Sequence, residues 1–463
     1  MPHGNPFGIR TLMGHLRVLP GGPLVLGMLI GLLGLLLLTW AWWGLVRAVS
    51  GRADGARLAR RTAVVWALPL LVAPPLFSGD GWSYVATGYL AGHGLSPYEV
   101  APAVLPDALS SGVARVWLNT TSPYGPVSLV WGGLFSRLTA DPWLLLFAYR
   151  LLAVAGLALL AAAIPTLARR FGVDPPRATA LAVASPLALV HGIGGLHNDL
   201  LVAGLVATAL SVTGRDRWRW GAVIAGVAAG VKVPGGAVAV GVVLLSLVPG
   251  ASLATRLRRA AEVALVSVGS LLALSVVSGL GLGWIHGLRA TADAPARLAP
   301  TALVGRGVSE LLRRAGSFGA ALNHRLDPVA LSKDVGLVLL VALLGWVLLR
   351  RRVPDERAAL TGAALAMLGV TLLSPALHYW YFLWCLPLLA AVPLARGPAR
   401  ALFALLAVLG PLAVADPALH ITWLTFTAVA ALVLVPLAAW FTDEDWGRRA
   451  GRPLRGRRNL HRA

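Results

Sequence analysis

Ionisable and polar side chains stand where the long apolar runs of this chain end. The groups are Asp80, the triplet His197-Asn198-Asp199, Lys232, and His378 with Tyr379 directly after it. Ionisable groups near the hydrocarbon of a membrane are rare, because each costs roughly 2.5–3.5 kcal/mol at the centre of an inserted helix. Several of them in one layer, drawn from separate apolar runs, therefore indicate a functional site.

Each group also has a purely structural explanation. An aspartate that follows Ser78-Gly79 can cap a helix or stay hydrated, and Asn198 or Asp199 can accept the first amides of the next helix. Lys232 can extend to the interface by snorkelling. His378 and the aromatic residues after it can belong to an interfacial belt. Taken singly, each group leaves these alternatives open.

Arg150 is harder to explain structurally, because it lies about two turns inside an apolar run, too deep to snorkel easily. The favoured partner for such a guanidinium is an acid or a phosphate. The chain has no P-loop, no GxSxG, no HExxH and no dinucleotide fingerprint after a strand. The energy for any reaction must therefore arrive with an activated substrate. The single cysteine, Cys385, excludes an internal disulfide and a multi-cysteine metal site.

The elements that must position these residues are membrane helices. Of the 463 residues 57% are hydrophobic and only 13% are charged, with a mean hydropathy of +0.75, against about 25% charged residues in soluble proteins. We therefore expect an all-α polytopic membrane protein in which residues 1–440 form one integral-membrane domain and 441–463 an Arg-rich cytoplasmic tail. Apolar runs near the ~20 residues needed to cross a bilayer predict about 13 spans: 23–46 (a retained helix, not a signal peptide), 62–78, 142–165, 177–193, 200–213, 220–233, 235–249, 261–283, 334–350, 358–374, 379–395, 400–415 and 420–440.

Arginine placement predicts the orientation of these spans. Most of the 40 Lys and Arg residues fall in loops on one face, and cytoplasmic loops carry such an excess. The N-terminus is then outside, the C-terminus is cytoplasmic, and the long loops 79–141 and 284–333 lie on the outer face of the plasma membrane. The net charge of +21 thus reflects topology and contact with anionic membrane lipid rather than nucleic acid.

Two local patterns refine this picture. The apolar segment 125–138 is too short to span and is expected to form a helix at the outer surface. The run around 232–236 is broken by proline and glycine, and non-helical backbone at membrane depth is tolerated where it is packed or lines a wet cavity. In the predicted orientation all the ionisable groups named above gather on the outer face.

The residues in these positions resemble those of the GT-C superfamily of glycosyltransferases that use lipid-phosphate sugars. The local sequence motifs are similar to those of the actinobacterial polyprenol-phosphomannose-dependent α-1,6-mannosyltransferases, and the similarity extends over most of the chain. The matching stretches are GDGWSYVATGYLAGHGLSPYEVAPAVLP (79–106), VWLNTTSPYGPVSL (116–129), GGLHNDLL (194–201), GVKVPG (230–235) and SPALHYWY (374–381). One departure from the family pattern is Gly81-Trp82 directly after Asp80, where a β-branched residue is expected.

The resemblance implies a bundle of the GT-C type with its active site on the outside loops, and an inverting transfer of mannose. The donor would be polyprenyl-phosphate-mannose, and the acceptor a mannan or lipomannan chain that gains an α-1,6 linkage. Asp80 would act as general base, with partial burial raising its basicity, while Lys232 and Arg150 would balance the departing phosphate and His378 would donate a hydrogen bond. Substrate-binding roles are implied for Trp82, Ser83, Tyr84, Tyr98, Tyr124, His197, Asn198, Asp199 and Tyr379. No second acid stands beside Asp80 in the sequence, so no cofactor and no divalent metal are expected.

Other functions remain alternatives at this stage. Within the same superfamily they are transfer of arabinose from decaprenyl phosphate, or of mannose to a phosphatidylinositol mannoside or a protein. A flippase or transporter for a polyprenyl-linked sugar would also use broken helices and embedded charges, although no internal repeat is visible. A structural partner of a cell-wall complex would leave the cluster of Asp, Lys and HND unexplained.

Overall fold

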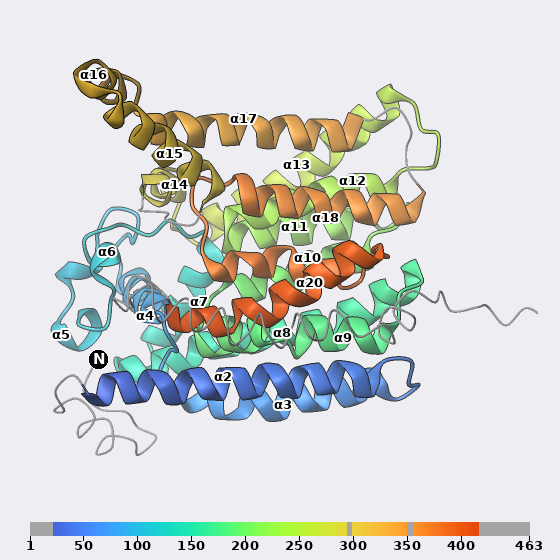
Figure 1. Ribbon diagram of the computed structural model, residues 1–463, viewed down its shortest axis with the longest axis horizontal. Helices are drawn as coiled ribbons and strands as arrows, with labels where there is room; N and C mark the ends of the chain where they lie inside the picture. Colours follow the sequence, from blue (N-terminus) through green and yellow to red (C-terminus); the bar gives the residue numbers. More distant parts are fainter. Residues whose placement is uncertain (1–21, 294–298, 350–354, 416–463) are drawn as a thin grey trace, which may run out of the picture.

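The computed structural model describes residues 22–293, 299–349 and 355–415, and these segments are helical with no strand among them (Figure 1). The predicted span 420–440 and the predicted tail 441–463 lie outside the described residues. Within these described residues, five helices are long and apolar enough to cross a membrane, or six if one bent pair is counted as a single span. The all-helical, polytopic membrane class is therefore confirmed, while the number of about 13 spans stays a prediction.

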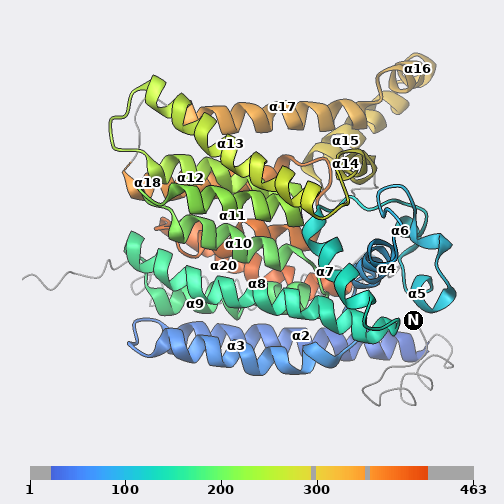
Figure 2. The same ribbon diagram turned by 180° about the vertical axis from the view of Figure 1, so that it is seen from behind.

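The long helices run side by side through the bundle, as both views show (Figures 1 and 2). They are α2 (Gly22–Val49), α3 (Gly55–Val72), α8 (Pro142–Phe171), α13 (Leu253–Val277), α17 (Pro328–Leu349) and α18 (Glu356–Leu373). One of them, α8, has clear signals at both ends. Asp141 caps α8 by accepting from the amides of Trp143 and Leu144, and Gly172 ends it in the left-handed conformation.

Short and broken elements fill the centre of the bundle. They are α9 (Pro175–Val183), the π-helix η2 (Leu187–Gly194), α10 (Asp199–Val212), α11 (Trp218–Val231), η3 (Val233–Ala237), α12 (Val238–Ser246), η4 (Tyr379–Trp384), α19 (Leu386–Leu389), α20 (Arg396–Leu409) and η5 (Pro411–Ala415). The 14 residues of α10 cover ~21 Å, short of the ~30 Å hydrocarbon core. The predicted break around 232–236 is confirmed, because Lys232 has extended backbone and ends α11.

The two long loops lie at the same end of the bundle (Figures 1 and 2). One contains α4 (Asp80–Gly92), η1 (Pro102–Val104), α5 (Asp107–Ser110), α6 (Arg115–Leu118) and α7 (Pro126–Ser136), and the other contains α14 (Trp284–Asp293), α15 (Pro300–Arg314) and α16 (Gly316–Leu326). The α2–α3 turn lies at the opposite end. This arrangement is the one that the arginine pattern requires of two loops on one face.

The predicted short helix in 125–138 is α7, and it packs against α4 through glycines. A Cβ atom on Gly132 would come within 2.8 Å of the Gly88 Cα atom, and one on Gly133 within 3.2 Å of the Gly92 amide nitrogen. Such small residues let two helix backbones touch inside a membrane protein. The backbone of α4, which begins at Asp80, is therefore held directly against that of α7.

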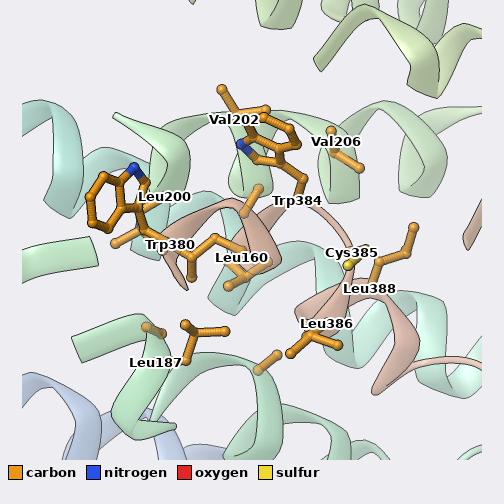
Figure 3. Close-up of a cluster of buried hydrophobic side chains, with 14 of the residues drawn as sticks. Leu160, Leu187, Leu200, Val202, Val206, Trp380, Trp384, Cys385, Leu386 and Leu388 are labelled. Atoms are coloured by element: carbon orange, nitrogen blue, oxygen red, sulfur yellow. The ribbon is translucent and has the colours of Figure 1, made fainter. Parts of the chain in front are cut away.

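A hydrophobic core packs beneath this end of the bundle. Figure 3 shows Trp380 and Trp384 of η4 beside Leu200 and Val202 of α10, with Leu160 of α8 close by. Trp384 and Leu160 are almost wholly buried. The two indole rings lie beside the polar residues His197 and Asp199.

Candidate active site

Asp80 is the first residue of α4 and is buried, with 8% of its surface exposed. Its Oδ1 atom accepts a hydrogen bond from the Trp117 indole nitrogen at 3.2 Å. Its Oδ2 atom lies 3.3 Å from Nδ1 of His197. Neither ring nitrogen of His197 makes a well-aligned hydrogen bond, so this contact is chiefly electrostatic. The carboxylate is thus oriented by two side chains that come from segments far apart in the sequence.

Strained backbone brings His197 to Asp80. Leu196 has a φ of 60° and Phe77 one of 56°, both in the left-handed region that costs a non-glycine residue energy. Gly81 permits the approach, since a Cβ atom there would lie 2.9 Å from a methyl carbon of Leu196. A side chain at position 81, where the family pattern has one, would therefore require the buried Leu196 side chain to shift.

Three rings are stacked behind this pair. His197 stacks on Trp380 with centroids 3.8 Å apart, and His378 stacks on the same indole at 4.6 Å. His191, from η2, binds instead to the Leu409 carbonyl oxygen through Nε2 at 2.8 Å. The stack holds the plane of the His197 ring, in which Nδ1 faces Asp80. It also explains the aromatic cluster after His378 by something more specific than an interfacial belt.

Lys232 and Asp199 form a second buried pair. The Lys232 Nζ atom lies 2.9 Å from Oδ1 and 3.2 Å from Oδ2 of Asp199. Trp384 donates to the same Oδ1 at 2.7 Å, and the carboxylate is completely buried. Asn198 occupies the N-cap position of α10 without a side-chain capping bond, so the capping alternative for the HND triplet is wrong. Snorkelling also fails to describe Lys232, since its ammonium group is paired inside the protein.

Aromatic faces line the space around Lys232. Its Nζ atom lies 4.3 Å from the ring centre of Tyr381 and 5.6 Å from that of Tyr124. Tyr84 meets Tyr124 edge to face with centroids 5.2 Å apart. The Tyr84 hydroxyl and both polar atoms of the Asn198 amide are buried without a hydrogen-bond partner. Buried polar atoms normally have partners, so these atoms fit contact with a polar ligand such as a sugar.

The environment shifts the pKa values of two of these groups. Burial alone would raise the pKa of the Asp80 carboxyl, but His197, together with His378 and Lys232, lowers it, and the net pKa lies below its usual range. Burial thus acts on this carboxyl in the expected direction, although the neighbouring groups leave its net pKa lowered. Burial lowers the pKa of the His378 imidazole to about 4. At neutral pH Asp80 is then ionised, and His378 is uncharged with one N–H left to donate.

Four predicted site residues have contacts of another kind. Trp82 packs edge to face on Trp143 with centroids 5.0 Å apart, and the Ser83 hydroxyl faces the Gly79 carbonyl oxygen in its own helix. The Tyr98 hydroxyl donates to the Tyr124 carbonyl oxygen at 3.0 Å. Tyr379 is buried with its ring 6.3 Å from that of His191. We assign these residues to the support of the site rather than to its surface.

Arg150 binds a backbone carbonyl oxygen rather than an acid. One terminal nitrogen, Nη2, donates to the Ala73 carbonyl oxygen at 2.5 Å, at the end of α3. Its Nε and Nη1 atoms are buried without hydrogen-bond partners. The guanidinium therefore supports the C-terminus of α3, where a cation is favourable. Its contact with a phosphate stays a prediction.

Three residues without a predicted role contact the predicted site. Trp117 binds Asp80, Trp380 lies between two histidines, and Trp384 binds Asp199. Trp117 and Trp380 lie inside the stretches that carry the family resemblance. Their position in these stretches could have marked them as site residues. Trp384 follows Tyr381 by three residues on η4, and its ring stacks on that of Tyr381 at 4.3 Å.

Comparison with known proteins supports the interpretation drawn from this geometry. The family described as "Alpha-(1->6)-mannopyranosyltransferase, N-terminal domain" matches residues 4–249, and the one described as "MptB C-terminal domain" matches residues 307–443. No solved structure matches the chain.

Curated relatives carry the same description. Alpha-(1->6)-mannopyranosyltransferase A of Mycobacterium tuberculosis is 34% identical over 81% of this chain and 73% of its own. The protein of that name from Corynebacterium glutamicum is 30% identical over 75% of each chain. A probable alpha-(1->6)-mannopyranosyltransferase of Mycolicibacterium smegmatis is 29% identical over 93% of this chain and 82% of its own. The protein therefore belongs to the alpha-(1->6)-mannopyranosyltransferase family and is a membrane glycosyltransferase that transfers mannose.

Proposed function

We propose that the protein transfers mannose from polyprenyl-phosphate-mannose to a mannan or lipomannan chain, forming an α-1,6 linkage at the outer face of the plasma membrane. The single observation that carries this proposal is the buried Asp80 carboxylate, held by Trp117 and His197 beside the aromatic surface around Lys232. The names of the relatives support the sugar and the linkage. The mobility of a lipid-borne donor in the bilayer suits a site at the end of a membrane bundle.

The reaction is one inverting displacement. The acceptor hydroxyl oxygen attacks C1 of the donor mannose, the bond from C1 to the phosphate oxygen breaks, and the hydroxyl proton passes to an Oδ atom of Asp80. The bonding electrons leave with the phosphate, which stays attached to the polyprenol. General-base catalysis of this kind contributes about 10²- to 10⁴-fold. Since its pKa is lowered, Asp80 is ionised at neutral pH and ready to accept the proton.

The leaving phosphate needs positive charge and N–H donors. Lys232 has three N–H groups, of which two face the oxygens of Asp199. We assign the third to an oxygen of the phosphate, with the neutral imidazole of His378 as a further donor. Asp199 then fixes the ammonium group in place, and the Tyr381 and Tyr124 rings beside it contact the sugar.

We also propose that transfer needs no divalent metal ion. The two buried acids of the site already have partners, Asp80 in His197 and Trp117, and Asp199 in Lys232 and Trp384. Incubation with EDTA should leave the transfer rate unchanged. Loss of transfer on chelation, with recovery on adding Mg²⁺ or Mn²⁺, would show that a metal takes part.

The decisive test uses the purified full-length protein in lipid vesicles, with radiolabelled polyprenyl-phosphate-mannose and a short α-mannoside. Wild type should form a longer mannoside, and Asp80→Asn should lose about 10²- to 10⁴-fold in kcat. Asp107→Asn, in the exposed first turn of α5, is the matched control and should keep full activity. Absence of transfer by wild type, or transfer only from decaprenyl-phosphate-arabinose, would overturn the proposed function. Full activity of Asp80→Asn would overturn the role of the base alone.

A further inference from the structure

Helix α15 (Pro300–Arg314) has three distinct faces. The first is packed against α17: Thr301, Ala302 and Gly305 are buried, and the Ser332 hydroxyl of α17 donates to the Thr301 carbonyl oxygen at 2.7 Å. A Cβ atom on Gly305 would lie 2.6 Å from the Cα atom of Val329. The close contact shows that this first face is fully occupied by the bundle.

The second face is apolar, and no other part of the described chain covers it. Val304, Val308 and Leu311 are 62%, 42% and 69% exposed. Their spacing of four and three residues places them on one stripe of the helix. Leaving such side chains in water costs roughly 1.5–3 kcal/mol each relative to burial, so a stripe of three calls for an apolar environment.

The third face is charged. Glu310 forms ion pairs with Arg313 and Arg314, the latter from Nε to Oε1 at 2.8 Å. Arg306 is exposed on the same face, since it precedes Glu310 by four residues and Arg313 by seven. Leu303 also falls in this charged stripe, seven residues before Glu310, and is 52% exposed. The helix is therefore divided into a bundle side, an apolar side and a charged side.

The neighbour of α15 indicates what covers the apolar side. Helix α17 is one of the candidate membrane spans, and only 11% of its apolar stretch is buried inside the described part of the protein. Val338 and Val341 are 68% and 70% exposed on it. A helix of this length and composition meets lipid over most of its surface. Both views place α15 at one end of α17 (Figures 1 and 2), so α15 lies directly beside a helix that meets lipid.

We propose that α15 is an interfacial helix that lies at the boundary between headgroups and acyl chains of the lipid bilayer. Val304, Val308 and Leu311 insert among the acyl chains, and the stripe that holds Arg306 and Glu310 stays in the headgroup layer. Amphipathic helices bind bilayers in this way. The surface stands at the same end of the bundle as Asp80 and is independent of the reaction proposed for that residue.

Site-directed spin labelling of the full-length protein in vesicles of phosphatidylcholine and phosphatidylglycerol tests this proposal. Cys385 is buried, and Cys385→Ala supplies a cysteine-free background. Single cysteines are placed at Val304 and Leu311 on the apolar side and at Leu303 on the charged side. Val338→Cys is the lipid reference and Arg52→Cys, in the exposed α2–α3 turn, is the water reference. Collision with oxygen reports lipid, and collision with a soluble nickel complex reports water.

The labels at positions 304 and 311 should have an oxygen-to-nickel accessibility ratio several-fold above that at 303 and close to that at 338. Leu303 and Leu311 are both exposed leucines on one helix. A difference between their accessibility ratios therefore reports only which side of the helix each residue is on. Equal, water-like ratios at all three positions would overturn the proposal, because the apolar side would then face solvent. Low accessibility to both reagents at 304 and 311 would also overturn it, because protein, either a partner or a second copy, would then cover this side.

Discussion

Two buried acids in one layer of this protein are held in different ways. Asp199 has both oxygens on the Lys232 ammonium group and a further bond from Trp384 at 2.7 Å. Asp80 has longer contacts, at 3.2 Å to Trp117 and 3.3 Å to His197. Environments that separate two carboxyl groups in this manner commonly separate their roles. Asp199 is suited to hold a cation in place, and Asp80 can exchange a contact for a proton.

His197 should act as a positioning residue for Asp80 through its Nδ1 atom. In His197→Gln the amide nitrogen replaces the distant Nε2 atom, whereas in His197→Asn it takes the place of Nδ1. We expect His197→Gln to lose on the order of 10²-fold in kcat through misplacement of the base, and His197→Asn to lose much less. Because the contact with His197 lowers the pKa of Asp80, its removal lets burial raise that pKa. The acid limb of kcat/KM should then move to higher pH in His197→Gln.

His191→Gln is the matched control for this prediction. His191 is buried nearby but binds the Leu409 carbonyl oxygen through Nε2, which glutamine can imitate. Its pH profile should stay that of wild type. If His197→Gln lowers the rate without moving the acid limb, or if His197→Asn is equally impaired, His197 has a purely structural role. Thermal unfolding of each variant shows whether the fold is kept.

The Lys232–Asp199 pair should affect stability and activity separately. Removal of one partner of a buried ion pair leaves an uncompensated charge and costs about 3–5 kcal/mol. We therefore expect Lys232→Met to lower the unfolding temperature strongly. The double variant with Asp199→Asn should recover much of that stability, since asparagine can still accept from Trp384, but it should stay inactive for lack of the cation. Transfer by the double variant at the wild-type rate would show that Lys232 serves only the fold.

At this scale the sequence could predict which residues gather but not which of them touch. Asp80, His197, Asp199, Lys232 and His378 share one layer because each ends an apolar run. Which of these side chains contact each other depends on where each one points, and the apolar runs in the sequence do not determine this direction. Lys232 and Asp199 are 33 positions apart, and their contact requires the non-helical backbone at Lys232. The packing of Trp82 on Trp143 was likewise not predictable. Its position in a motif does not indicate where its side chain points.

At the scale of elements, the segment of α9 and η2 differs most from what the sequence pattern predicts. Residues 177–193 read as a single apolar run, yet the chain forms α9, a break, and the π-helix η2 (Leu187–Gly194), bent by 42°. π-helical turns are rare and occur often at functional sites. Hydropathy could locate this segment but not its bend, because a bent helix and a straight one have the same composition.

The glycine contact between α4 and α7 gives a prediction at the scale of elements. A methyl group at Gly132 would meet the Tyr149 hydroxyl and the Gly88 backbone, so Gly132→Ala should separate the helices and lower the unfolding temperature and the transfer rate together. Gly34→Ala on α2 is the control, because a Cβ atom there has no neighbour within 4 Å. It should be neutral or stabilise by up to about 1 kcal/mol, the gain in helix propensity. Equal unfolding temperatures for the two variants would contradict the close contact.

For the whole molecule, charge and shape agree on the two ends of the bundle. The loops with α4–α7 and with α14–α16 share one end, and the Arg-bearing α2–α3 turn is at the other (Figures 1 and 2). Composition was sufficient to predict a helical membrane bundle, because hydrocarbon forces long apolar runs into helices. It could not supply the number of spans, since short and broken helices such as α10 and η4 differ from full spans in path and not in hydropathy.

The orientation can be tested on intact cells with a membrane-impermeant thiol reagent. Cysteines at Leu95 and Arg325, in the loops near the site, should be labelled without lysis. Cysteines at Arg52 and Arg217 should be labelled only after lysis, because loops rich in arginine stay in the cytoplasm. Wild type, whose single cysteine is buried, should stay unlabelled throughout. Labelling of 52 and 217 on intact cells would place Asp80 on the cytoplasmic side.

The glycine crossing of α4 and α7 also divides the first long loop into a helix pair and the segment that joins its two helices. Both ends of the segment that joins these helices are anchored to one rigid pair, whose backbones are in contact at Gly88 and Gly132. Trp117, Tyr98 and Tyr124 are on the joining segment, whereas Asp80 belongs to the pair itself. The backbone of the base therefore depends on the helix pair, whereas the direction of its carboxylate depends on Trp117 of the joining segment. Position and orientation of the base thus come from separate parts of one loop.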